Sequence, residues 1–173
     1  MNINNIRKSI SEARFSTYLR ESNGNAEQAL KLYIYNCHLC ESLYTLINIL
    51  EVTLRNNFQM ELTTTYGDKW YDSEKLSQKD KEKILKAKNT FNKKRQFTSN
   101  DIMPSLSFGF WVGLLWSEHE TELWRPCLKN AFSNAPKPLT RGAALERLKQ
   151  INRFRNRIAH HEPIYNKKPE AVY

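Results

Sequence analysis

The chain has 173 residues and a formal net charge of +9, a length that suits one domain over residues 1–173 with a core that needs no metal or disulfide. Five glycines and six prolines leave few turn signals, which favours helices over a sandwich of short strands and predicts an all-α fold, a helical bundle. The positive charge favours a polyanionic partner, with nucleic acid ahead of a membrane surface.

The chain begins with ten mostly polar residues, so we expect no cleavable signal. The longest stretch without charge, residues 102–117, is too short to span a bilayer. An odd number of cysteines, three, argues against a disulfide framework. Cys37 and Cys40 have the spacing of half a zinc site but lack a second pair, so we expect buried helical cysteines. Together these features predict a reduced, cytoplasmic protein with no membrane association.

The first half of the chain predicts a short helix over residues 9–21, a turn over 22–25, and then a long helical segment. Residues 26–66 contain neither glycine nor proline, so they form one long central helix or two nearly continuous ones. Glu51 and Arg55 interrupt its apolar face. Glu51 pairs either with Arg55 along the helix or with Arg155 across the core, and the sequence leaves both open.

A basic segment follows, with nine Lys or Arg residues between positions 75 and 95 against Asp80 and Glu82. Such a run is commonly a solvated helix face. It also provides an electrostatic track for a phosphate backbone, so we predict RNA contacts there from Lys86, Lys93, Lys94 and Arg95.

Three features lead to the last helix. A helix that opens at Pro104 carries large apolar side chains up to Trp116, which form core or, as a second possibility, a dimer surface. Residues 119–133 predict a further helix, and residues 134–138 predict a loop. Thr140 then has the position and side chain of a cap for the final helix.

The final helix ends in the densest group of reactive side chains, residues 151–163. Pro163 stops the helix and places His160 and His161 in or just past its last turn. Asn156 lies one turn before His160, so its amide is expected to orient the imidazole. Arg155 projects close to the apolar row, where an arginine requires a carboxylate partner or a groove shared with a second subunit.

Arg155, Asn156 and His160 together resemble the motif of HEPN-domain ribonucleases, an arginine and a polar residue followed by a histidine. The string of residues 155–164 is similar to the Abi-like branch of that superfamily. Further stretches agree in order over most of the chain: residues 12–19, 32–36, 50–56, 66–70 and 106–111.

The resemblance implies a metal-independent endoribonuclease that uses no cofactor and acts in bacterial abortive infection, as part of phage defence or a toxin–antitoxin system. His160 would act as the general base or acid, and His161 is the alternative proton carrier. Arg155 would stabilise charge on the phosphate, and Asn156 would orient the histidine or a phosphate oxygen. Glu51 and Arg55 would support this site. Arg153 and Arg157 would extend the RNA contacts.

The resemblance also implies a homodimer whose two motif helices form one composite cleft, products with a 2′,3′-cyclic phosphate and a 5′-hydroxyl, and an antitoxin of RNA or protein. Two alternatives stay open. His160 and Asn156 could simply cap a helix end, with Arg155 as a buried tether. The chain could also be a non-catalytic RNA-binding or regulatory HEPN module.

Overall fold

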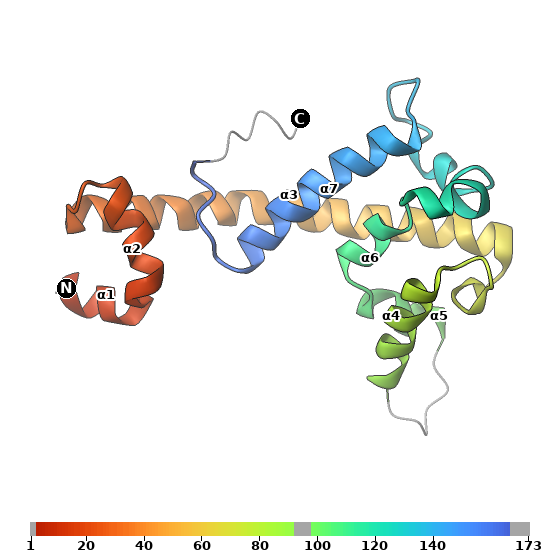
Figure 1. Cartoon of the computed structure of the whole chain (residues 1–173), viewed down its shortest axis with the longest axis horizontal. Helices are drawn as coiled ribbons and strands as arrows, with labels where there is room; N and C mark the ends of the chain where they lie inside the picture. Colours follow the sequence, from red (N-terminus) through yellow and green to blue (C-terminus); the bar gives the residue numbers. More distant parts are fainter. Residues whose placement is uncertain (1–2, 92–97, 167–173) are drawn as a thin grey trace. The chain divides into compact units, whose positions relative to one another are not determined.

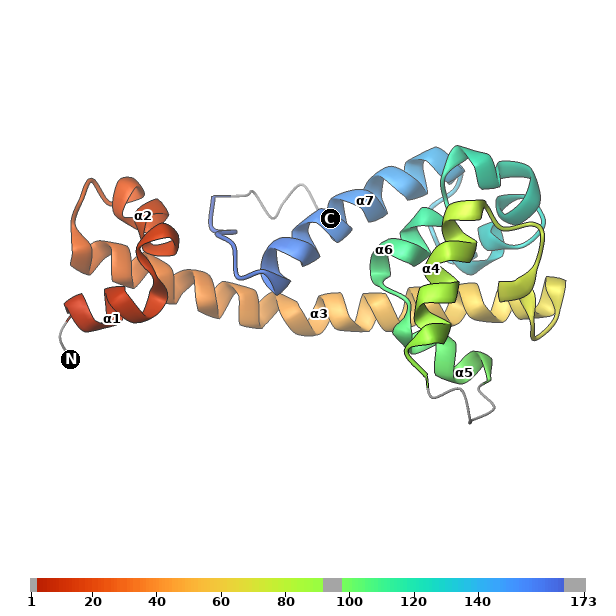
Figure 2. The same cartoon turned by 60° about the horizontal axis from the view of Figure 1, so that its bottom comes forward.

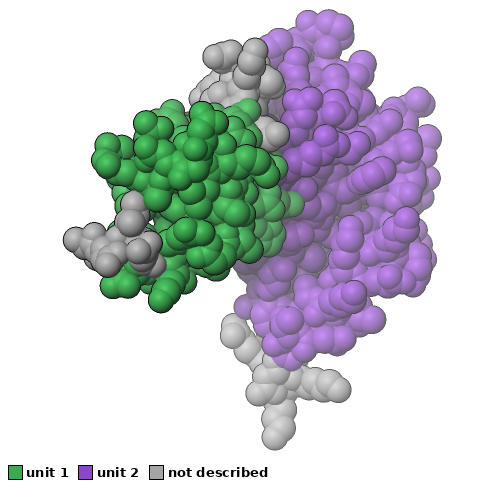
Figure 3. Space-filling view, turned by 60° about the vertical axis from the view of Figure 1, so that its left-hand side comes forward, with its two compact units in different colours: residues 1–46, 154–173 green, residues 47–153 purple. Residues whose placement is uncertain are grey.

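The computed structural model describes residues 3–91 and 98–166, and within these ranges it contains helices and irregular segments but no strand. The prediction of an all-α fold with a long central helix is confirmed. The chain divides into two compact units, shown in Figure 3: unit 1 comprises residues 1–46 and 154–173, and unit 2 comprises residues 47–153. A single domain over residues 1–173 stays a prediction. No helix in the described ranges is both long and apolar enough to cross a bilayer.

The central helix, α3 (Ala26–Tyr66), is one continuous helix that contributes residues to both units. It starts where the side-chain oxygen of Asn25 accepts hydrogen bonds from the backbone N–H groups of Glu27 and Gln28, at 3.1 and 3.0 Å. It ends at Gly67, whose φ of 81° lies in the left-handed region that glycine adopts at low cost. The absence of glycine and proline between these two ends explains its length.

Unit 1 packs α1 (Ile3–Ile10) and α2 (Glu12–Glu21) beside the first turns of α3, as Figures 1 and 2 show. Its core contains the fully buried Phe15, Tyr18 and Ala29, and Tyr18 meets Tyr33 edge-to-face with ring centroids 5.3 Å apart. The single helix predicted for residues 9–21 is in fact broken. Ser11 adopts a φ of 79° and begins α2, with its hydroxyl accepting from the N–H of Arg14.

Unit 2 contains the rest of α3, α4 (Gln78–Asn89), α5 (Ser99–Ile102), α6 (Phe108–Gly113) and most of α7 (Arg141–Ala159). Short helical turns connect them: η1 (Trp70–Asp72), η2 (Met103–Ser105), η3 (Ser117–His119), η4 (Glu120–Trp124) and η5 (Leu128–Phe132). Its core includes Phe58, Leu62, Trp70, Trp111 and Leu148. The predicted cap is confirmed, because Thr140 Oγ1 accepts from the N–H of Ala143 at 3.2 Å.

Two helices of unit 2 differ from their predictions. The helix expected from Pro104 starts later, because Leu106 is extended and the hydroxyl of Ser107 accepts from the N–H of Phe110 at the start of α6. The helix expected over residues 119–133 is a series of short turns. Pro126 lies within that stretch and can neither donate a backbone hydrogen bond nor fit its ring into a regular helix.

The cysteines also differ in part from expectation. Cys37 and Cys40 lie on α3 as predicted, but Cys37 is exposed and Cys40 is only half-buried, whereas Cys127 is buried in unit 2. The buried position next to this pair belongs to Asn36, whose amide nitrogen lies 3.7 Å from the Cys40 sulfur.

Candidate active site

The end of α7 is a closed hydrogen-bonded turn that places both histidines. The N–H of Glu162 donates to the carbonyl of Arg157 at 2.8 Å, and the N–H of His161 donates to Ile158 at 3.0 Å. His161 has a φ of 54°, the left-handed conformation that normally follows such a helix end. Because the residue is not glycine, this conformation costs about 1 kcal/mol. Both histidines therefore lie past the last regular turn, as predicted, and both are exposed.

A buried side chain holds the segment that follows the two histidines. Asn36 of α3 is only 3% exposed, and its Oδ1 accepts from the N–H of Ile164 at 2.7 Å and from the N–H of Tyr165 at 3.3 Å. Ile164 is fully buried, and the ring of Tyr165 packs on Tyr18. Since the chain is anchored at Ile158 within α7 and again at Ile164, the histidines occupy a short loop with two fixed ends.

Arg14 and Arg157 fix this loop further within unit 1. Nη2 of Arg14 donates to the carbonyl of His160 at 3.3 Å. Arg157 directs Nε and Nη2 to the carbonyl of Pro163, at 3.2 and 2.6 Å, while its Nη1 lies 3.5 Å from Glu162. These contacts give Arg157 a structural task in addition to the RNA contact predicted for it.

The three motif residues lie on the last turns of α7, in unit 1. Asn156 and His160 are exposed, and Arg155 is half-buried, in agreement with its position next to the apolar row. Nη1 of Arg155 donates to Oδ1 of Asn156 at 3.5 Å, which is a long contact for a hydrogen bond. The N–H of His160 donates to the backbone carbonyl of Asn156. The structure thus brings these residues to one helix end.

The predicted supporting residues belong to unit 2. Glu51 and Arg55 are half-buried on the part of α3 that belongs to unit 2, and Nε of Arg55 donates to Asn56. A pair between Glu51 and Arg155 would join residues of different units, so it stays a prediction. Arg153, the last residue of unit 2, is exposed as an RNA contact requires.

Only part of the basic segment over positions 75–95 lies within the described residues. Lys86 is exposed on α4, and neither it nor Lys79 forms an ion pair within residues 3–91 and 98–166, whereas Lys81, Lys83 and Lys88 each have an acidic neighbour. Lys93, Lys94 and Arg95 lie outside the described residues, so their roles stay predictions.

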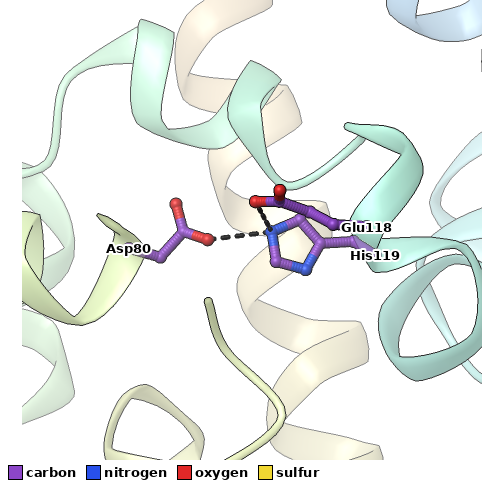
Figure 4. A group of neighbouring side chains, drawn as sticks. All are labelled: Asp80, Glu118 and His119. Atoms are coloured by element: carbon purple, nitrogen blue, oxygen red, sulfur yellow. Dashed lines mark hydrogen bonds and ion pairs between the residues drawn. The ribbon is translucent and has the colours of Figure 1, made fainter. Parts of the chain in front are cut away.

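Unit 2 contains a second group of titratable side chains, shown in Figure 4. Nε2 of the buried His119 lies 2.8 Å from Oδ2 of the buried Asp80, and Oε1 of Glu118 lies 3.6 Å from the same nitrogen. Three such donor atoms can in principle hold a cation. The hydroxyl of Ser77, at 2.5 Å, and the imidazole instead share one oxygen of Asp80, which is the geometry of a hydrogen-bonded pair.

The charge state of Asp80 is set by opposing effects. Burial by itself raises its pKa, but hydrogen bonds from His119 and Ser77 and the positive charge of Lys83 outweigh burial and hold the pKa below its ordinary value. Asp80 therefore stays ionised at neutral pH and joins α4 to η3. We assign the group a structural role in unit 2.

Sequence reasoning missed Asn36 as a positioning residue and missed the Asp80–His119 pair. The only signal for Asn36 was a polar residue inside a helical stretch that matched the family resemblance. Asp80 and His119 lie on different elements, and no local pattern links two residues so far apart in the chain.

Replacement of Asn36 by Leu should leave the buried N–H groups of Ile164 and Tyr165 without an acceptor. We expect unfolding to become easier by about 1–3 kcal/mol and amide exchange at these two residues to accelerate. Asn48→Leu, at an exposed position of the same helix, is the control and should change neither. Unchanged exchange at Ile164 and Tyr165 in Asn36→Leu would show that the tether is not needed.

Replacement of Asp80 by Ala should lower the free energy of unfolding at neutral pH by about 3–5 kcal/mol, because it leaves His119 buried without its partner. Since the folded state lowers the pKa of Asp80, its contribution is complete above the ordinary pKa of about 3.9 and is lost as the pH falls through the lower folded value. Denaturant titrations across this range check both statements. Glu82→Ala, an exposed acid on α4, should change stability by less than about 0.5 kcal/mol.

The chain matches the family described as Abi-like protein over residues 3–166. Neither the curated proteins nor the solved structures contain a match.

Proposed function

Because the chain belongs to the Abi-like protein family, we propose that it acts in abortive infection as a metal-independent endoribonuclease of the HEPN type. The observation that carries the proposal is the group Arg155, Asn156 and His160 at one solvent-accessible helix end, held by the two anchors at Ile158 and Ile164. A toxin–antitoxin setting with an RNA or protein antitoxin, and a cytoplasmic location, belong to the same proposal.

The chemistry needs only groups that this helix end offers. RNA carries its own nucleophile, the 2′-hydroxyl, so the protein has to move protons and stabilise charge on the phosphate. An imidazole at position 160 accepts the 2′-hydroxyl proton, and the guanidinium of Arg155 binds two phosphate oxygens through its planar fork. The attacking oxygen forms a bond to phosphorus while the bond to the 5′-oxygen breaks. The departing 5′-oxygen takes a proton from solvent water, which yields a 2′,3′-cyclic phosphate and a 5′-hydroxyl, and the protonated imidazole returns its proton to the solvent.

A second copy of the chain completes the site in this proposal. Five residues along a helix turn the side chain by about 140°, so Arg155 and His160 of one copy diverge from each other. Two motif ends that meet across a two-fold axis would let the arginine of one copy and the histidine of the other contact the same phosphate.

In this proposal the two copies meet through an exposed face of α3 within unit 2. Ile49, Val52, Thr53, Asn56 and Met60 are exposed and follow one another at helical spacing. Ile49 and Met60 each leave 57% of their surface accessible. Large apolar side chains grouped in this way are typical of an interaction surface.

Cleavage of mixed RNA in EDTA should occur with the wild type and should fall at least about 100-fold in Arg155→Ala and His160→Ala. His161→Gly should retain cleavage and gain about 0.5–1 kcal/mol of stability, because glycine suits the left-handed position. Product ends are checked by chromatography and by labelling of the new 5′-hydroxyl. Cleavage that needs an added divalent metal, or that survives both substitutions, contradicts the mechanism. Binding without any cleavage supports the non-catalytic module instead.

A mixture of the Arg155→Ala and His160→Ala proteins tests the composite cleft. Random pairing makes half of the dimers mixed, and each mixed dimer keeps one intact pair of Arg155 and His160 from different copies. We therefore expect about a quarter of the wild-type rate to return. No recovery would mean that both residues of a site come from one copy.

Charge placed on the α3 face should separate the copies. Ile49→Glu combined with Met60→Glu is expected to give a monomer by analytical ultracentrifugation, with loss of cleavage and a retained helical spectrum. The matched control is Leu85→Glu on α4, because Leu85 is also 57% exposed but lies outside this face. A dimer that persists in the double variant places the contact elsewhere.

A further inference from the structure

Trp116 is the large apolar residue of residues 104–116 that is not buried in the core. Its neighbours Phe110, Trp111, Leu114 and Leu115 are almost completely buried, whereas Trp116 leaves 51% of its surface exposed. The backbone becomes extended at Trp116, with φ −65° and ψ 158°, between α6 and η3. The expectation that this segment forms core therefore holds for these four residues and not for Trp116.

Two lysines from different helices lie near the exposed ring. Nζ of Lys149, on α7, lies 5.2 Å from the ring centroid. Lys83, on α4, lies near Gly113 on the same side as the pyrrole edge of Trp116: a Cβ added to that glycine would lie 3.8 Å from Lys83 Nζ and 3.8 Å from Trp116 Cδ1. Nζ of Lys83 is also 6.0 Å from the centroid of the Phe110 ring. All of these residues belong to unit 2.

The charges of both lysines stay available to a ligand. Lys149 lies 3.9 Å from Glu146, and Lys83 lies 3.8 Å from Asp80. Such long pairs of partly exposed lysines contribute little. Lys83 faces Oδ1 of Asp80, whereas His119 and Ser77 bind Oδ2, and the lysine side chain remains 49% exposed to a ligand. The exposed Lys86, one turn along α4 from Lys83, extends the positive surface.

We propose that Trp116 is a stacking platform for an unpaired base of single-stranded RNA, with Lys83 and Lys149 contacting the phosphates on either side. The choice of RNA over another single strand rests on the proposed function. Exposed aromatic rings flanked by cations suit this ligand, because every base has a π-face and each phosphate carries negative charge. A duplex keeps its base faces inside the stack, so the platform selects single strands.

The test uses the His160→Ala protein, which binds without cutting, and three probes of about a dozen nucleotides: a single strand, the same strand in a duplex, and an abasic strand. We expect the single strand to quench tryptophan fluorescence. A further Trp116→Ala change should weaken its binding about 5- to 150-fold, the effect of one lost stacked base. Trp116→Phe should retain most of the affinity, and binding of the abasic strand should be the same with and without Trp116.

Matched controls separate this proposal from the ribonuclease. Tyr44→Ala removes an aromatic residue of α3 that is 60% exposed and should leave RNA binding unchanged. The platform is overturned if the His160→Ala protein binds the single strand equally well with and without the added Trp116→Ala change. In that case, cleavage in EDTA by the wild type would still support the ribonuclease. Weakened binding in Trp116→Ala together with uncut RNA supports the platform and removes the ribonuclease. A wild type that binds no single strand removes both.

Discussion

The placement of the candidate active site depends on a single buried acceptor, the side-chain oxygen of Asn36. It receives the N–H groups of two consecutive residues just after the turn that ends α7. An irregular segment in a protein interior must find partners for its backbone groups. One amide on α3 meets that need, and the packing of Ile164 and Tyr165 follows from it. Without this acceptor, the two histidines would be attached at one end only.

Two further contacts hold the loop at its other end. The left-handed conformation of His161 closes the turn that follows α7, and the guanidinium of Arg157 donates a hydrogen bond to the carbonyl of Pro163. A histidine at this position costs about 1 kcal/mol that glycine would not. The helix end thus combines a rigid backbone with exposed side chains, which is the arrangement that proton transfer to a positioned substrate requires.

Local patterns predicted the parts of this structure that local physics determines. The long run without glycine or proline gave α3, Pro163 marked the end of α7, and Thr140 was recognised as its cap. The two helices that were predicted wrongly, over residues 9–21 and 119–133, also have local causes. Ser11 adopts a positive φ that is unusual for serine, and Pro126 prevents a regular helix. The contacts of Asn36 with Ile164 and of Asp80 with His119 join segments that are remote in sequence. The hydrophobic periodicity of each segment does not show which remote segment it contacts. Residue spacing alone therefore located the motif but not its support.

The continuity of α3 has a consequence for how this chain can change over time. Its first half carries Asn36 and Ala29, and its second half carries Leu54, Phe58 and Leu62, without a break between them. Insertion or deletion of one residue in the middle would rotate all later side chains by about 100° relative to the earlier ones. Between Leu54 and Leu62 such a change would turn core residues of unit 2 off the buried face, whereas surface loops can vary in length.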